Sequence, residues 1–279
     1  MSDYQTILFD VPSSAVARIT MNRPEARNAQ DVRMTFELNA AFDRAAHDDA
    51  IKVIILAGSD PHFSAGHDLR DRSSPAEFEP VGTWGGFGQP GAEGYMAREE
   101  EIYLGMCRRW RSIPKPMIAQ VQGKCIAGGL MLAWVCDLIV ASDDAQFQDP
   151  VVQMGVCGVE YFAHPWELGA RKAKELLFTA DWFTAAEAHR LGMVNQVVPR
   201  GDLERFTLGL AERIARKPSF ALKLVKEAVN QTQEAQGQWT AMLSVFNLHQ
   251  LCHSHNMQVH GMLIDPSGIP GAVRRKTEA

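Results

Sequence analysis

The fold of this chain is decided by residues 117–129, which read MIAQVQGKCIAGG. The first five form a short, mostly apolar run, so they predict a strand. Gly123 then marks a turn, and the pair Gly128 and Gly129 opens a helix that runs toward Trp134. N–H groups at a helix start have no partner inside the helix, which suits an oxyanion. Tight packing also explains an isolated Ala-Gly-Gly, so this stretch alone does not define a site.

A second turn of the same kind lies upstream, in residues 63–69, which read FSAGHDL. It follows the apolar run 53–57, which predicts another strand. Its small residues leave backbone N–H groups unobstructed. Two such turns, each directly after a strand, are able to supply two N–H donors to one oxygen. The pattern predicts oxyanion binding, but it does not name a substrate.

The flanking sequence predicts an α/β core. Runs 15–21 and 138–141 are also typical of strands, whereas 32–46 and 99–111 carry apolar residues at helical spacing. An alternation of strands and helices favours α/β packing, in which helices cover a largely parallel sheet.

Two later segments depart from this alternation. Residues 71–94 are rich in Gly, Pro and Ser around Trp84 and Phe87, which predicts a long loop of the kind that is functional or disordered. After Asp202 the pattern is nearly all helical, with helices expected over 202–216, 218–232 and 236–256. We expect the last dozen residues to form a tail.

Composition narrows the class of protein. Of the 279 residues, 46% are hydrophobic, which is enough to bury a sizeable core. The formal net charge is −5 and no Lys/Arg cluster occurs, so nucleic acid is not an expected partner. We find no basic, apolar leader and no apolar run of roughly 18 residues, so we expect a cytoplasmic protein with no membrane span. The five cysteines lack C-x-x-C spacing, which predicts reduced thiols.

Several short motifs occur in a characteristic order. They are residues 22–29 (NRPEARNA), 64–69 (SAGHDL), 127–129 (AGG) with 136–137 (CD), 145–147 (AQF), 176–180 (LLFTA), 185–188 (AAEA) and 191–194 (LGMV). In this order they resemble the motifs of the crotonase (enoyl-CoA hydratase/isomerase) superfamily, over about residues 5–235. The combination is far more specific than any single motif.

The resemblance implies an overall organisation. It implies an α/β fold, a crotonase-like ββα superhelix over residues 1–200, followed by a C-terminal helical trimerisation region over 201–279. It further implies a homotrimer or a dimer of trimers. The expected partner is an acyl-CoA substrate, with coenzyme A present only as part of that substrate and no separate cofactor.

The resemblance also implies site residues. The N–H groups of His67 and Gly128 are expected to form the oxyanion hole for the thioester carbonyl, where an enolate is stabilised. The turn residues Ala65, His67 and Asp68 are the expected contacts to coenzyme A. Arg27 is a candidate phosphate contact, although an exposed arginine at such a turn is often only solvated.

The sequence departs from the family at the two glutamates that hydratases use to activate water. Met131 and Val151 stand at these positions, where they would line an apolar acyl pocket but transfer no proton. Glu160 is the leading substitute acid/base; its alternative is a solvated loop carboxylate. His67 is the next candidate, unless it is present only for its N–H. His164, Asp149 and Tyr161 are weaker candidates.

Four histidines, His249, His253, His255 and His260, recur on the last predicted helix. His249 and His253 have the i, i+4 spacing of a metal-binding pair. The sequence offers no third ligand, so we predict a polar face or a subunit contact here and no metal site.

Three functions are compatible with these features. The leading one is a crotonase-type enzyme that acts on an acyl-CoA as a hydratase or isomerase, as in fatty acid metabolism, with an unusual acid/base group. The second is an acyl-CoA binding protein with little turnover, and the third is a crotonase-fold hydrolase that uses His67 or Glu160. Turnover separates the first from the second. The sequence does not identify the acyl group. The composition of the loop 71–94 is explained either by a pocket for a bulky acyl group or by mobility.

Overall fold

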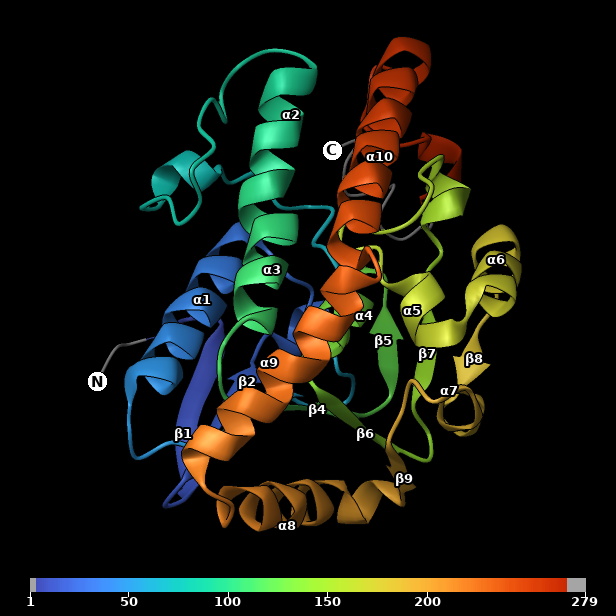
Figure 1. Cartoon of the computed structure of the whole chain (residues 1–279). Coiled ribbons are helices and arrows are strands. Elements are labelled where there is room, and N and C mark those ends of the chain that lie inside the picture. The colour runs from blue at the N-terminus through green and yellow to red at the C-terminus, as the bar shows by residue number, and fades with distance from the viewer. Residues whose placement is uncertain (1–3, 270–279) are drawn as a thin grey trace.

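A six-stranded sheet runs through the centre of the computed structural model, which describes residues 4–269 (Figure 1). Its strands, in spatial order, are β1 (Ile7–Ser13), β2 (Val16–Met21), β3 (Val53–Gly58), β4 (Met117–Val121), β6 (Leu138–Ser142) and β9 (Gln196–Val198). β1 pairs antiparallel with β2, and every later pair is parallel. The four strands predicted from the sequence are confirmed. β1, half-exposed at the edge, and β9, only 3 residues long, were not predicted.

Strand β3 shows why its sequence is apolar at every position. Val53 and Ile55 face a core cluster that includes Leu203 of α8 (Leu203–Ala215), whereas Ile54 and Leu56 belong to the main core. Side chains alternate between the two faces of a strand, so a strand covered on both faces must be apolar throughout.

A smaller sheet lies beside the first and carries the ββα pattern. It consists of β5 (Lys124–Ile126), β7 (Gln146–Gln148) and β8 (Phe183–Thr184), in that order. β4 is followed by β5 and then by α4 (Gly128–Trp134), which is the strand, turn and helix that residues 117–129 predict. These strands are at most 3 residues long, so their sequence signal is weak.

Helices surround the two sheets. Their bounds are α1 (Val32–His47), α2 (Ala92–Glu99), α3 (Met106–Arg111), α5 (His164–Leu168), α6 (Ala170–Thr179), α7 (Ala185–Leu191), α9 (Ser219–Ala235) and α10 (Gln238–His260). The predictions for α1 and for the three C-terminal helices α8, α9 and α10 are confirmed within a few residues. In Figure 1, α10 runs alongside α2, which is far from it in the sequence.

The predicted helix 99–111 and loop 71–94 need correction. The helix begins at Ala92, because Gly91 has φ +70 and ends the loop there. The middle of this helix, Glu100–Gly105, is a π-helix, which is an irregularity that the apolar spacing does not reveal. The loop is therefore shorter than predicted. Its tip is anchored, since the Glu101 carboxylate accepts hydrogen bonds from the N–H groups of Val81 and Gly82.

Other predictions have mixed outcomes. All five cysteines are free, and Cys107, Cys125 and Cys136 are buried. No helix within residues 4–269 is both long and apolar enough to cross a membrane. The predicted tail lies mostly outside the described residues. Apolar side chains such as Phe220 and Leu251 are exposed on α9 and α10, and the predicted trimer contact stays a prediction.

Candidate active site

The turn that carries His67 uses nearly all of its backbone donors. Ala65 N–H donates to Arg27 O, Gly66 N–H to Ser64 Oγ, and Asp68 N–H to Gln30 O. Within residues 4–269, the His67 N–H has no acceptor. Because unpaired backbone N–H groups are uncommon in folded proteins, the unpaired N–H of His67 marks a position open to a ligand.

The N-terminus of α4 has the same property. Ala127 N–H donates to Gln148 O and Leu130 N–H donates to Ala127 O, but the Gly128 N–H finds no acceptor in the described part of the chain. Ala127 has φ 47 and ψ −111, a backbone conformation that non-glycine residues rarely adopt. The chain therefore bends sharply just before the free donor.

The two turns are held against each other. Ile126 N–H donates to Ser64 O at 3.0 Å, and a β-bridge joins Ser64 to Cys125. Gly66, with φ +86, lies so close that a Cβ would be 2.6 Å from Ile126 O and 3.1 Å from Gly128 N. Only glycine fits this position. The structure thus brings the unpaired N–H groups of His67 and Gly128 onto adjoining turns.

The imidazole of His67 covers this pair of turns. It packs on Gly128 so closely that a Cβ there would lie 2.4 Å from His67 Cδ2. The ring also stacks on Tyr103 of the π-helix, with ring centroids 3.6 Å apart. His67 Nδ1 lies 3.7 Å from Glu160 Oε1, and no described residue hydrogen-bonds its buried Nε2. Tyr103 was not predicted, because nothing in the sequence places the π-helix over the turn.

Glu160 is buried, with only 3% of its surface exposed. Its Oε1 lies 3.7 Å from His249 Nε2 as well as from His67, and its Oε2 has no hydrogen-bond partner among the described residues. A solvated loop carboxylate is therefore the wrong interpretation. The structure brings Glu160 to the side of the His67 ring.

Asp149 and His164 support the loop that carries Glu160. The two side chains are buried and joined by a 2.8 Å hydrogen bond from His164 Nε2 to Asp149 Oδ2. Asp149 also accepts hydrogen bonds from the N–H groups of Val151 and Val159, the latter next to Glu160. Tyr161 is buried as well. These three residues, the weaker acid/base candidates, thus hold the loop in place.

Met131 and Val151 lie in the apolar core. Met131, on α4, is 1% exposed, and Val151, which begins the 3₁₀ helix Val151–Met154, is 8% exposed. Both belong to the main hydrophobic cluster. Neither side chain has an atom that can donate or accept a proton.

The expected contacts to coenzyme A have different environments. Arg27 is exposed and has the left-handed φ of 57, with its carbonyl oxygen bound to Ala65. Asp68 lies between Arg23 and Arg70, at 3.0 and 3.2 Å. Burial would raise the pKa of Asp68, but hydrogen bonds from Arg70 and Arg23 bring it below the ordinary value. The Asp68 carboxylate is thus already paired.

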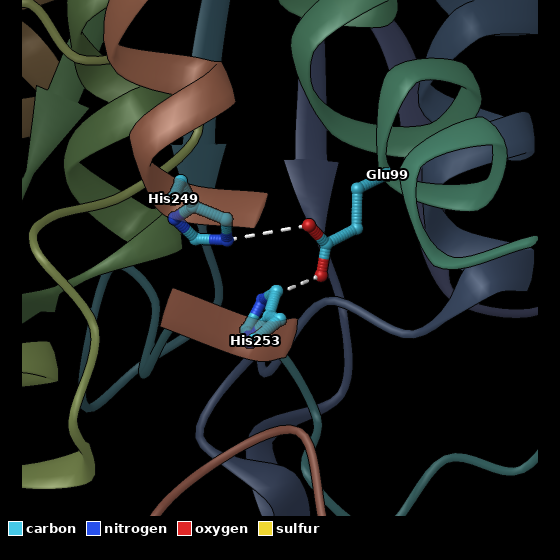
Figure 2. Close-up of side chains that lie close together, drawn as sticks. All are labelled: Glu99, His249 and His253. Carbon is cyan, nitrogen blue, oxygen red and sulfur yellow. Dashed lines mark ion pairs between the residues drawn. The ribbon is translucent and has the colours of Figure 1, made fainter. Parts of the chain in front are cut away.

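Glu99, His249 and His253 form a second polar cluster (Figure 2). It lies next to Glu160, because His249 Nε2 is 3.7 Å from Glu160 Oε1. Glu99 ends α2, and both histidines project from α10 toward its carboxylate. All three are buried. Burial alone would lower the pKa of His249, but the carboxylates of Glu160 and Glu99 raise it to about 10. The i, i+4 spacing signalled the histidines, whereas only the fold reveals Glu99.

Comparison with known proteins agrees with this architecture. The family model described as enoyl-CoA hydratase/isomerase matches residues 12–264. The chain therefore belongs to the enoyl-CoA hydratase/isomerase family, within the crotonase superfamily.

Individual relatives cover nearly the whole chain. A Mycobacterium tuberculosis protein named "Putative enoyl-CoA hydratase EchA13" is 46% identical over 265 residues, which is 92% of this chain and 82% of that protein. The crystal structure of a "probable enoyl-CoA hydratase" from Mycobacterium smegmatis matches with a TM-score of 0.85 and 50% identity, over 92% of this chain and 98% of that one. An enoyl-CoA hydratase/isomerase from Xanthobacter autotrophicus Py2 matches with a TM-score of 0.79 and 30% identity, over 98% of each chain.

Proposed function

We propose that this enzyme binds an acyl-CoA with its thioester carbonyl oxygen between the N–H groups of His67 and Gly128, and that it stabilises the enolate formed there. The observation that carries the proposal is the pair of unpaired backbone donors on adjoining turns, found within residues 4–269. A preorganised donor of this kind contributes roughly 2.7 to 4 kcal/mol to the transition state in the best-studied case.

Glu160 is the proposed acid/base group. Its carboxylate takes the proton from the substrate carbon next to the thioester, and the electron pair of that C–H bond moves toward the carbonyl oxygen. In a 3-enoyl-CoA the same carboxyl then returns the proton to the far carbon of the double bond, as the enolate electrons move that double bond into conjugation with the thioester. Its burial and its place beside His67 support this role. With Met131 and Val151 at the usual glutamate positions, proton transfer by one carboxylate replaces the two-glutamate activation of water.

The coenzyme A moiety is proposed to lie along the outer side of the His67 turn. The exposed Arg27 side chain is the candidate phosphate contact, and the backbone around Ala65 is the candidate adenine contact. Asp68 contributes by fixing Arg23 and Arg70 rather than by binding the ligand itself. For these steps we propose no cofactor besides the coenzyme A of the substrate, and we propose a trimer or dimer of trimers as the assembly.

Turnover and binding, measured in parallel, test the proposal. Purified protein is incubated with crotonyl-CoA, a longer trans-2-enoyl-CoA and a 3-enoyl-CoA, while the absorbance of the conjugated thioester is followed. We expect all three to bind, and the 3-enoyl-CoA to gain conjugated absorbance, since that shift needs one proton-transferring carboxylate. Rapid hydration of crotonyl-CoA would contradict the inference that Met131 and Val151 remove the usual activation of water. Tight binding without any conversion would favour an acyl-CoA binding protein.

A further inference from the structure

We propose that Glu99, His249 and His253 bind a divalent transition-metal ion of the zinc class, next to the candidate active site. Two imidazole nitrogens and one carboxylate form a ligand set that protein zinc sites use, and it leaves a position for water. The inference goes beyond the proposed function, since none of the steps above involves a metal.

The distances in the cluster fit one ion. Glu99 Oε2 lies 3.2 Å from His249 Nε2, and Glu99 Oε1 lies 3.0 Å from His253 Nε2 (Figure 2). All three candidate ligand atoms lie within 4.8 Å of one another. Ligands bound at about 2.0 to 2.2 Å from one tetrahedral or octahedral ion are roughly 2.9 to 3.5 Å apart. The two Glu99–histidine separations fall in this range, and the 4.8 Å limit on the whole set means that a small inward shift of the side chains brings all three ligands to one ion.

Two buried imidazole nitrogens that lack a hydrogen-bond partner favour an ion in this cluster. Despite these short separations, neither His249 Nε2 nor His253 Nε2 has a hydrogen-bond partner that satisfies both distance and angle among the described residues. By contrast, His164 Nε2 makes an aligned 2.8 Å hydrogen bond to Asp149. An ion between the two rings would give both buried nitrogens a partner.

The other side of each ring is fixed in the way that metal-binding histidines require. His249 Nδ1 lies 2.8 Å from Gly158 O, and His253 Nδ1 lies 2.7 Å from Leu263 O. A carbonyl oxygen only accepts, so both Nδ1 atoms carry a proton, and loss of the second proton from each ring leaves an Nε2 lone pair facing Glu99. Gln250 Nε2 in turn donates to Glu99 Oε2 at 2.5 Å and orients the carboxylate.

Protons on the two imidazole rings would compete with a metal ion for this cluster. In the absence of a cation, the carboxylate of Glu99 raises the pKa of His253 against the effect of burial, as happens at His249. Two imidazolium rings would then have centroids only 4.5 Å apart. One divalent ion carries the same total charge at a single point. Both rings are then neutral, so they do not repel each other.

An ion here would join α10 to the end of α2. Its ligand His249 lies 3.7 Å from Glu160, so the ion would also fix one wall beside the candidate acid/base group. The ion is thus a positioning element in this proposal.

Metal titration of the full chain tests the site. The protein is treated with a chelator, and then titrated with zinc by calorimetry and with cobalt(II) by visible absorbance. We expect one equivalent per chain, with micromolar or tighter affinity, and an increase in melting temperature on zinc addition, because an ion that binds the native state stabilises it.

Matched variants assign the ligands. His253→Ala and Glu99→Gln should weaken binding at least 100-fold, whereas His255→Ala, on the exposed side of the same helix, should bind as the parent does. Cys252→Ser should also bind normally and excludes the neighbouring thiol as the ligand. Circular dichroism confirms that each variant folds. Absence of stoichiometric binding to the parent chain, or binding that Glu99→Gln and His253→Ala leave unchanged, would overturn the proposal and leave protons as the occupants.

Discussion

The two halves of the candidate site are built in different ways. The His67 and Gly128 turns offer backbone N–H groups, the first after β3 of the central sheet and the second after β5 of the smaller sheet, and they are joined through the bridge between Ser64 and Cys125. The opposite side offers side chains, Glu160 from a loop, Glu99 from α2 and His249 from α10. Backbone chemistry follows from the local sequence, because turns and glycines define it. Side-chain chemistry depends on which distant elements pack together.

Removal of the proposed acid/base carboxyl should have the largest effect. Glu160→Gln keeps the shape of the side chain but cannot accept a proton, so we expect turnover to fall about 10²- to 10⁴-fold with little change in acyl-CoA binding. Steady-state kinetics and a binding titration measure the two effects. Glu167→Gln is the matched control, since Glu167 lines a separate cavity that His67, Gly128 and Glu160 do not line. Equal losses in both variants would contradict the role of Glu160.

Displacement of a backbone donor should have the next largest effect. In Gly66→Ala the new Cβ would crowd Gly128 N and Ile126 O, so we expect a loss of about 10²- to 10³-fold in kcat, the effect of removing one oxyanion donor.

Gly85→Ala is the control for Gly66→Ala, because no atom lies within 4 Å of the added Cβ. It should turn over like the parent chain. A fully active, folded Gly66→Ala enzyme would show that the turns do not bind the carbonyl oxygen.

The Glu167 carboxyl, which the proposed catalysis does not use, should make the stability of the chain depend on pH. Burial raises its pKa to about 7, above the ordinary 4.5, so the folded state binds the proton more tightly than the unfolded state. The free energy of unfolding should therefore fall as the pH rises from about 4.5 through 7. Glu167→Gln removes this loss and should stabilise the chain by about 1 to 3 kcal/mol at pH 8, but not near pH 4. Urea unfolding at both pH values measures the difference, and an equal effect at both would contradict the shift.

The smallest effect is expected from a substitution of Met131 in the apolar core. Met131→Leu conserves volume in the core, so it should cost less than about 1.5 kcal/mol of stability and leave kcat within about two-fold. Thermal unfolding and kinetics measure both quantities. A loss of 100-fold in turnover would mean that Met131 contributes more than an apolar surface.

The difference between the backbone half and the side-chain half of the candidate site also explains which of its features could be predicted from the sequence. The strands at 53–57 and 117–121 and the turns after them were predictable, because their apolar runs and glycines are local signals. Glu160 was singled out by its place in the chain, but its burial required the structure. Tyr103 and Glu99 were missed, because their roles arise from a π-helix and from the contact between α2 and α10. No local pattern encodes either one.

Exchange of the substrate proton in D₂O tests the central claim most directly. A saturated acyl-CoA, such as butyryl-CoA, is incubated with the enzyme, and deuterium at the carbon next to the thioester is measured by mass spectrometry. If the His67 and Gly128 donors stabilise an enolate and Glu160 carries the proton, deuterium will enter this position, and Gly66→Ala and Glu160→Gln will slow its entry at least 100-fold. Saturating binding of the acyl-CoA without any exchange would contradict enolate formation at this site.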